Sequence, residues 1–349
     1  MRASLQRLGC AVAVGLLLSG CATHSKRGQA EQAAAAHRQQ TEEAAQINLD
    51  SAADRAAKRR LADHDARLRR LQAELAARTD ADSLAASALL QREVSGAVGP
   101  SALDLASRAV AAAPGRADLA LLHLQLCESA PGCDAAPLER HLAQLDPDNG
   151  MPWIYALAHA AQANANAPWR AARTHLAASQ RITSYWTATV THLTAAAAGR
   201  QGFDAVAAMI ELTGAENTLT APLQPVARAC SLEDVQQSEV LGQCRAIAAA
   251  FLKADTVLFE AYGSTLALRL WPPGSAQSQA IVRQRRALRY RSEQMLRLHE
   301  RFNSPAATRA LVGFVQHAAS EQMALKALFA DLGVPPEPPA SWVDDTPGG

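Results

Sequence analysis

Apolar residues recur at helical spacing along most of this chain, and prolines and glycines separate the periodic segments. Alanine, the best helix former, is abundant, while long alternating runs of valine, isoleucine and threonine do not occur in the sequence. From about residue 84 the breaks fall at 95–100, 113–115, 131–132, 146–150, 164–168, 199–202 and 213–214. The pattern predicts an all-α chain built from helices of ordinary length.

A repeat of 33 residues runs through the middle of this series. Pro114 and Pro147 are separated by this distance, and Ala120, Trp153 and Trp186 repeat it in two successive steps. Each helical hairpin of such a series has an apolar face that it cannot bury alone, so neighbouring units must stack. The spacing predicts helix–turn–helix units arranged as an α-solenoid. An irregular helical bundle, with two prolines at this separation by chance, is the alternative.

The repeat resembles the tetratricopeptide family, whose units are about 34 residues long. The resemblance rests on Trp153, which follows Pro147 by six residues, and on the small and apolar residues after it. The chain lacks the family's glycine and tyrosine in the first helix, and Gln180 stands where a proline would close the third unit. We assign the repeats to residues 84–215. The resemblance, which covers about residues 100–200, implies that the first helices line a concave surface that binds peptides.

Helical patterns of another kind flank the repeats. Residues 48–82 place Leu61, Leu68 and Leu75 seven residues apart, which predicts an amphipathic helix. A weak coiled coil is the alternative, which the poor apolar seam, with His64 and Arg78 at neighbouring core positions, makes the less favoured of the two. Residues 216–332 are expected to form a C-terminal helical subdomain. Its long helices are predicted at about 237–271, interrupted by Gly263, then at 276–302 and 305–332, followed by a disordered Pro-rich tail at 333–349.

The N-terminus carries a short apolar run that ends in a cysteine. Arg2 and Arg7 precede an apolar stretch at 8–18, which is too short to cross a bilayer as a helix. With the small residues before Cys21, this segment resembles the lipobox of bacterial lipoproteins. The resemblance implies a signal peptide at 1–20 and attachment of lipid, including palmitate, to Cys21. An ordinary secretory signal and an uncleaved membrane anchor are the alternatives.

The residues after the cysteine bear on location. Residues 21–47 are rich in alanine, glutamine and glutamate, and we interpret them as a lipidated tether. Ala22 is typical of proteobacterial lipoproteins that are exported to the outer membrane. We therefore expect a lipid-anchored protein on the periplasmic face of the outer membrane of a Gram-negative bacterium.

The net charge expected for the mature chain argues against nucleic acid as a partner. Removal of the signal peptide reduces the 34 lysines and arginines by two, leaving 32 against 33 acidic residues. A chain so close to neutrality does not bind nucleic acid through its bulk charge.

The cysteine count agrees with an oxidising compartment. Of the 6 cysteines, one leaves with the signal peptide and one carries lipid, so that an even set of four remains. We predict the disulfides Cys127–Cys133 and Cys230–Cys244, because each pair is local and brackets a turn or a helix start. A four-cysteine zinc site is disfavoured by the spacings, and neither a metal nor a cofactor is expected.

The sequence shows no familiar catalytic motif. It contains neither a Gly-rich phosphate loop nor a nucleophile elbow. Histidines recur every 16 to 18 residues without recurring carboxylate partners, which indicates one histidine on each helix rather than a metal site; they are His123, His141, His159, His175 and His192. A carboxylate site near Cys230 is the enzymatic alternative, formed from Glu211, Glu216, Glu233, Asp234 and Glu239.

Two groups of residues are candidates for a binding surface. One is aromatic and lies on the predicted first helices of successive units: Trp153, Tyr155, Tyr185 and Trp186. The other belongs to the densest basic stretch, which suits an anionic partner: Arg285, Arg286 and Arg289. Core packing and a solvated helix face are the simpler interpretations of these two groups.

These observations favour a scaffold over an enzyme. The leading hypothesis is a periplasm-facing lipoprotein that binds another envelope protein through helical repeats, without catalysing a reaction. The alternative is a cell-envelope enzyme that acts on cell-wall polymers through carboxylates. Oligomerisation through residues 48–82 is a further possibility that the sequence leaves open.

Overall fold

The computed structural model describes residues 54–93, 99–204, 221–297 and 305–343, together with positions 208 and 212. Within these ranges all regular secondary structure is helical, apart from one isolated bridge between Asn149 and Arg181. The all-α prediction is therefore confirmed. None of the described helices is both long and apolar enough to cross a bilayer.

The chain divides into two units, residues 1–63 and 64–349. In the first unit the described residues, 54–63, are helical. In the second unit the chain is helical to residue 76, and Leu68, Leu71 and Leu75 are buried in a core that also contains residues of the following helices. The rest of the fold concerns this second unit.

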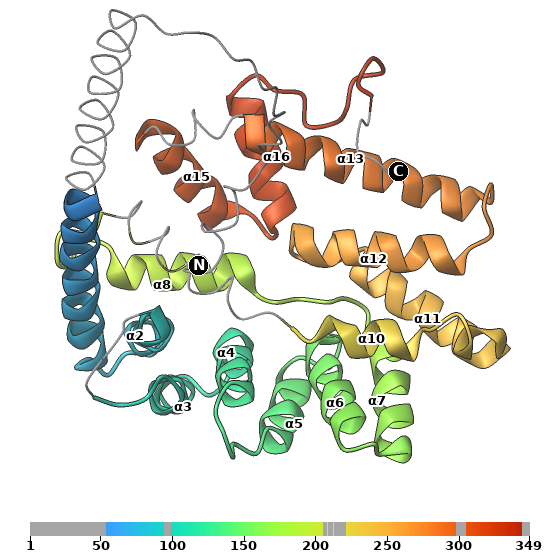
Figure 1. The fold of residues 1–349 in the computed structure, drawn as a ribbon, viewed down its shortest axis with the longest axis horizontal. Helices are drawn as coiled ribbons and strands as arrows, with labels where there is room; N and C mark the ends of the chain where they lie inside the picture. The colour runs from blue at the N-terminus through green and yellow to red at the C-terminus, as the bar shows by residue number, and fades with distance from the viewer. Residues whose placement is uncertain are drawn as a thin grey trace, which may run out of the picture. The chain divides into compact units, whose positions relative to one another are not determined.

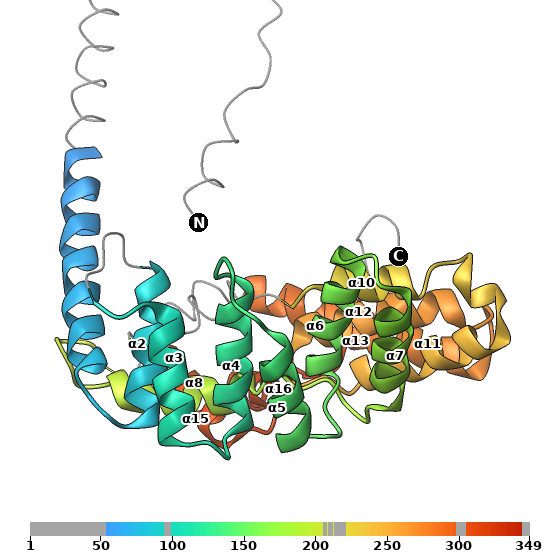
Figure 2. The same ribbon diagram turned by 90° about the horizontal axis from the view of Figure 1, so that it is seen from below.

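Six successive helices pack in chain order, each on the next (Figures 1 and 2). They are α2 (Ala81–Glu93), α3 (Ala102–Ala112), α4 (Ala117–Glu128), α5 (Ala136–Leu145), α6 (Met151–Gln162) and α7 (Asn166–Ala178). Polar caps set some of their starts: the Ser101 hydroxyl accepts the N–H of Asp104, whose carboxylate accepts the N–H of Ser101. Apolar faces between neighbours form the core, in which Leu105, Leu124 and Leu142 are fully buried.

Helix α8 (Trp186–Ala197) departs from this order. Its main contacts are with α2 and α15, whereas α7 packs on α11. The backbone turns at Tyr185, whose φ of 59° lies in the left-handed region. The second 33-residue step thus does not bring Trp186 into surroundings like those of Trp153: Trp153 stacks on the ring of His175, and Trp186 packs beside Val312 and Val315.

In the later part of the unit, two of the long predicted helices, 237–271 and 305–332, are each divided into two. The elements of this part are α10 (Leu223–Ala229), the 3₁₀ turn η1 (Asp234–Gln236), α11 (Ser238–Phe251), α12 (Val257–Leu270), α13 (Ala276–Arg297), α15 (Pro305–His317) and α16 (Glu321–Asp331). The predicted helix at 305–332 is divided by Ser320, whose hydroxyl accepts the N–H of Met323 and caps α16. The predicted boundary between 215 and 216 lies outside the described residues.

The predicted interruption at Gly263 is corrected. The break in the 237–271 segment falls after Phe251, and Gly263 lies inside α12. A Cβ atom at Gly263 would stand 2.6 Å from the Cβ of Phe251 and 2.8 Å from its carbonyl carbon. The glycine therefore serves the close packing of α11 against α12 rather than a helix break.

Both predicted disulfides are present. Cys127–Cys133 joins the end of α4 to the segment before α5, and Cys230–Cys244 joins the end of α10 to the middle of α11. Each bond fixes a turn between helices that follow one another in the chain.

The Pro-rich tail also differs from expectation in its described part. Residues 333–343 lie along α13, where the indole N–H of Trp342 donates to Glu293 and Glu337 pairs with Arg291. Residues 344–349 lie outside the described residues.

Candidate functional site

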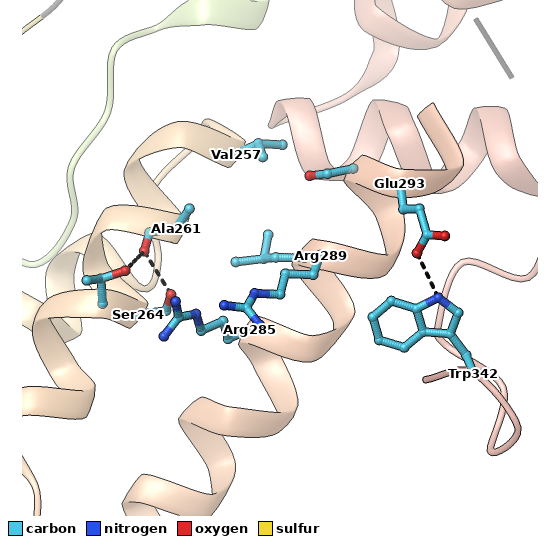
Figure 3. Close-up of a pocket in the computed structure, with 10 residues that line it drawn as sticks. Val257, Ala261, Ser264, Arg285, Arg289, Glu293 and Trp342 are labelled. Atoms are coloured by element: carbon cyan, nitrogen blue, oxygen red, sulfur yellow. Dashed lines mark hydrogen bonds between the residues drawn. The ribbon is translucent and has the colours of Figure 1, made fainter. Parts of the chain in front are cut away.

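Helix α13 carries two arginines that line a pocket. Arg285 and Arg289 are four residues apart, so their side chains leave the same face of the helix. Figure 3 shows both side chains extending from α13 towards Ser264 and Ala261 of α12. The two helices pack directly on one another, which fixes the separation of the pocket walls.

The pocket has a volume of about 480 Å³, within the ordinary range for ligand sites. Ala261, Ser264 and Thr265 form the α12 wall, while Leu288 adds apolar surface from α13. The Ser264 and Thr265 hydroxyls both donate to the carbonyl of Ala261, 2.8 and 3.0 Å away. An apolar floor with guanidinium groups at its side suits a ligand that has an apolar body and an anionic group.

The C-terminal segment supplies a further wall. Trp342 lines the pocket, and its indole N–H donates to the Glu293 carboxylate over 2.8 Å (Figure 3). The indole ring meets Tyr290 edge-on, with ring centroids 5.5 Å apart. These contacts hold the segment that follows α16 beside the pocket.

Arg286 has a different role from its two neighbours. Its guanidinium lies 5.2 Å from the Trp342 ring centroid and donates to the backbone carbonyls of Pro339 and Trp342. The predicted set of three arginines therefore divides: Arg285 and Arg289 line the pocket, while Arg286 holds the wall in place.

The predicted aromatic residues do not form one surface. Trp153 stacks on His175 with a centroid distance of 4.2 Å and lines a second, largely alanine-walled cavity of about 560 Å³. Tyr155 is 2 % exposed and belongs to the core, where burial raises its pKa. Tyr185 donates to Asp146, and burial together with that carboxylate raises the Tyr185 pKa. Trp186 faces α15.

A carboxylate pair around His159 was missed by the sequence reasoning. The Nε2 atom of His159 lies 2.7 Å from Glu128, and its Nδ1 atom lies 2.6 Å from Glu139. Burial raises the pKa of Glu139, although His159 opposes the shift. The three residues come from α6, α4 and α5. They are far apart in the sequence and meet only because these successive helices stack, so the sequence spacing does not indicate the cluster.

The remaining candidates are placed as follows. The Asp234 carboxylate accepts from the Ser231 hydroxyl, and Glu239 accepts from Gln243, so these acids meet polar neighbours rather than each other. Glu211, Glu216 and the lipidation candidate Cys21 lie outside the described residues. Within the described ranges no group of three histidines, cysteines or acids is arranged to hold a metal ion.

Comparisons with protein-family models, with curated proteins and with solved structures found no match for this chain.

Proposed function

We propose that this protein is a lipid-anchored envelope scaffold that binds another envelope protein through the pocket between α12 and α13. The observation that carries the proposal is the placement of Arg285 and Arg289 beside an apolar floor in a pocket of about 480 Å³. Two guanidinium groups on one face of α13 suit recognition of an anionic group on a partner.

The anchor and the compartment rest on the sequence, with support from the cysteines. The lipobox-like motif ending in Cys21 predicts acylation, and firm attachment to a bilayer takes more than one acyl chain. The two disulfides suit the oxidising periplasm that the motif implies. Outer-membrane location follows from Ala22 and belongs to the same proposal.

The helical scaffold rests on the stacking of α2 to α7. Their chain-order packing supports a tetratricopeptide-like solenoid over this part of the predicted repeats, and α8 marks where the order ends. In such an assembly the helices present side chains from consecutive units on one surface. The proposal assigns them a supporting role, with recognition at the α12–α13 pocket.

Two experiments in cells test the proposal. Labelling with a palmitate analogue should mark the wild-type protein and not Cys21→Ser. Chemical crosslinking followed by purification should recover the same envelope protein from replicate cultures of wild type and lose it with the Arg285→Gln/Arg289→Gln variant. A reproducible partner that the double variant retains equally would contradict the pocket as the binding surface.

The enzymatic alternative gains no support from the contacts of the described acids. Glu128 and Glu139 both contact the ring of His159, one at each ring nitrogen. Glu233, Asp234 and Glu239 were the acids proposed for a carboxylate site, and the described contacts of Asp234 and Glu239 are with uncharged neighbours.

A further inference from the structure

A third cavity abuts the arginine pocket. It measures about 440 Å³ and lies between α13 and α16. Val257, Leu288 and Ser292 line both cavities, so the two form one groove along α13. The far end of this groove is lined by Arg291, Met295, Glu321, Gln322 and Leu325.

Two buried polar side chains at this far end have side-chain atoms without a hydrogen-bond partner among the described residues. Gln322 is 9 % exposed, and neither its amide nitrogen nor its amide oxygen has a hydrogen-bond partner among the described residues. Arg291 is 4 % exposed; its Nη1 atom pairs with Glu337, but its Nε atom has no partner in the same ranges. Buried polar groups in proteins are nearly always hydrogen-bonded, so these atoms are available to a group that enters the groove from outside.

We propose that the groove binds the carboxyl-terminal end of an extended peptide. The terminal carboxylate lies at Arg285 and Arg289, and a backbone amide of the peptide meets Gln322. The inference rests on the proposed binding function and deepens it by naming which part of the partner is bound.

The chemistry of the two ends sets the direction of the peptide. Guanidinium groups pair with carboxylates through charge-assisted hydrogen bonds, which places the terminal charge at Arg285 and Arg289. Among the described residues, the far end holds a single guanidinium, that of Arg291, which already pairs with Glu337. A carboxylate there would also meet Glu321, which accepts the N–H of Val257 over 2.8 Å. Gln322 offers one donor group and one acceptor, which matches the C=O and N–H of a peptide backbone.

The length of the groove sets the length of the peptide. From Arg285 to Met295 the helix rises by about 15 Å, at about 1.5 Å per residue. An extended strand advances by about 3.3 Å per residue, so about four peptide residues span the groove. The shared residues Val257 and Leu288 favour apolar side chains in the middle of such a peptide.

The test compares two forms of one probe on the full-length lipidated protein in detergent micelles. The probe is acetyl-Ala-Leu-Ala-Leu with a free carboxylate, and its partner is the same peptide with a C-terminal amide. Calorimetric titration should show the acid binding about tenfold or more tightly than the amide, since a hydrogen bond to a charged group contributes at least this much. Equal affinity of the two forms, or no binding of either, overturns the proposal.

Two variants separate the ends of the groove. Arg285→Gln/Arg289→Gln should abolish the preference for the acid, so that the acid and amide forms bind with equal affinity. Gln322→Leu should weaken both forms by about tenfold and preserve their ratio. Because this change replaces an unpartnered buried amide with an apolar group of similar size, the melting temperature should stay level or rise, which excludes unfolding as the cause. A Gln322→Leu variant that binds both peptides like wild type contradicts the assigned amide contact.

The result also separates this inference from the proposed function. Recovery of a partner from crosslinked cells together with failure of both peptides removes the peptide-end assignment and leaves the scaffold function standing. Binding of the acid peptide in vitro without any cellular partner supports the groove and contradicts the scaffold function.

Discussion

Asp255 accepts hydrogen bonds from both the backbone N–H and the hydroxyl of Ser184, a residue 71 positions earlier in the chain. The same carboxylate accepts the N–H of Trp186, at the start of α8. The backbone carbonyl of Asp255 accepts the N–H of Glu321, which begins α16. One short connection, between α11 and α12, therefore ties the start of α8 and the start of α16 to the helix that walls the arginine pocket.

Loss of the Asp255 carboxylate should destabilise the fold. Asp255→Ala leaves the N–H groups of Ser184 and Trp186 and the Ser184 hydroxyl without their acceptor, and we expect a loss of about 2–4 kcal/mol in the free energy of unfolding. Ser184→Ala, the matched control, removes only the hydroxyl and should cost about 1 kcal/mol. Urea denaturation of both variants measures the difference. Equal losses for the two would contradict the central role of the carboxylate.

Two glycine substitutions in neighbouring helices should have opposite effects. Gly263→Ala forces a methyl group against Phe251 and should cost about 1–3 kcal/mol, because the close atoms include backbone that cannot move aside. Gly242 lies in α11, and no neighbouring group among the described residues is found within 4 Å of a Cβ atom added there. Gly242→Ala should therefore raise the free energy of unfolding by about 0.5–1 kcal/mol. Thermal unfolding followed by circular dichroism ranks the variants, and a destabilised Gly242→Ala would show that the packing of α11 is misjudged.

The start of α2 should show a pH-dependent cap. Burial raises the pKa of Asp80, but hydrogen bonds from Arg78 and Ser83 outweigh it and hold the pKa at about 2. Because the folded-state pKa is depressed, the carboxylate stabilises the fold fully above its ordinary pKa of 3.8 and loses this effect as the pH falls through about 2. Asp80→Ala should therefore cost about 1 kcal/mol at pH 7.

The difference in the free energy of unfolding between wild type and Asp80→Ala should shrink as the pH falls from 4 towards 2. Urea titrations of wild type and Asp80→Ala at pH 7, 4 and 3 follow this change. Asp80→Asn is the control, because asparagine also caps helices and should retain most of the stability at pH 7. A wild-type advantage that grows on acidification would contradict the assigned cap.

The two disulfides should be reduced in a fixed order. Cys230 and Cys244 are 1 % and 0 % exposed, whereas Cys133 is partly exposed at the surface between α4 and α5. Dithiothreitol should therefore open Cys127–Cys133 in the folded protein, and Cys230–Cys244 only under conditions that unfold it. Alkylation at timed intervals with peptide mass mapping follows each pair. Simultaneous loss of both bonds in native buffer would contradict the burial of the second pair.

Sequence periodicity predicted the helices and the local disulfides because both depend on neighbours in the chain. Proline and glycine breaks placed most helix ends of α3 to α7 to within a few residues. Cys127–Cys133 and Cys230–Cys244 each join residues that one turn or one helix brings together. Such features need no knowledge of distant contacts.

What the sequence did not predict depends on contacts between distant segments. Gly263 was interpreted as a break because its partner, Phe251, is reached only when α11 folds against α12. Trp186 shares a 33-residue step with Trp153, but α8 turns away to pack on α2 and α15. Trp342 and Glu337 contact residues of α13 that lie 49 and 46 positions earlier in the chain, and the Pro-rich composition of their segment does not indicate these contacts.

The candidate site was predicted in part. The density of basic residues predicted a binding surface at Arg285, Arg286 and Arg289. Their spacing alone did not show that Arg285 and Arg289 line the pocket, whereas Arg286 contacts the C-terminal segment. Gln322 carried no signal in the sequence, since its importance lies in buried amide atoms without partners among the described residues.

The central claim is that a protein partner occupies the pocket between α12 and α13. Site-specific photocrosslinking in living cells tests it most directly, with the photoreactive residue at Thr265, which is exposed and lines the pocket. Gln162, exposed on α6, is the control position. The account predicts one adduct of defined mass at position 265, containing a single envelope protein, which the Arg285→Gln/Arg289→Gln variant loses and which position 162 does not form. No adduct at position 265, or the same adduct at both positions, would contradict it.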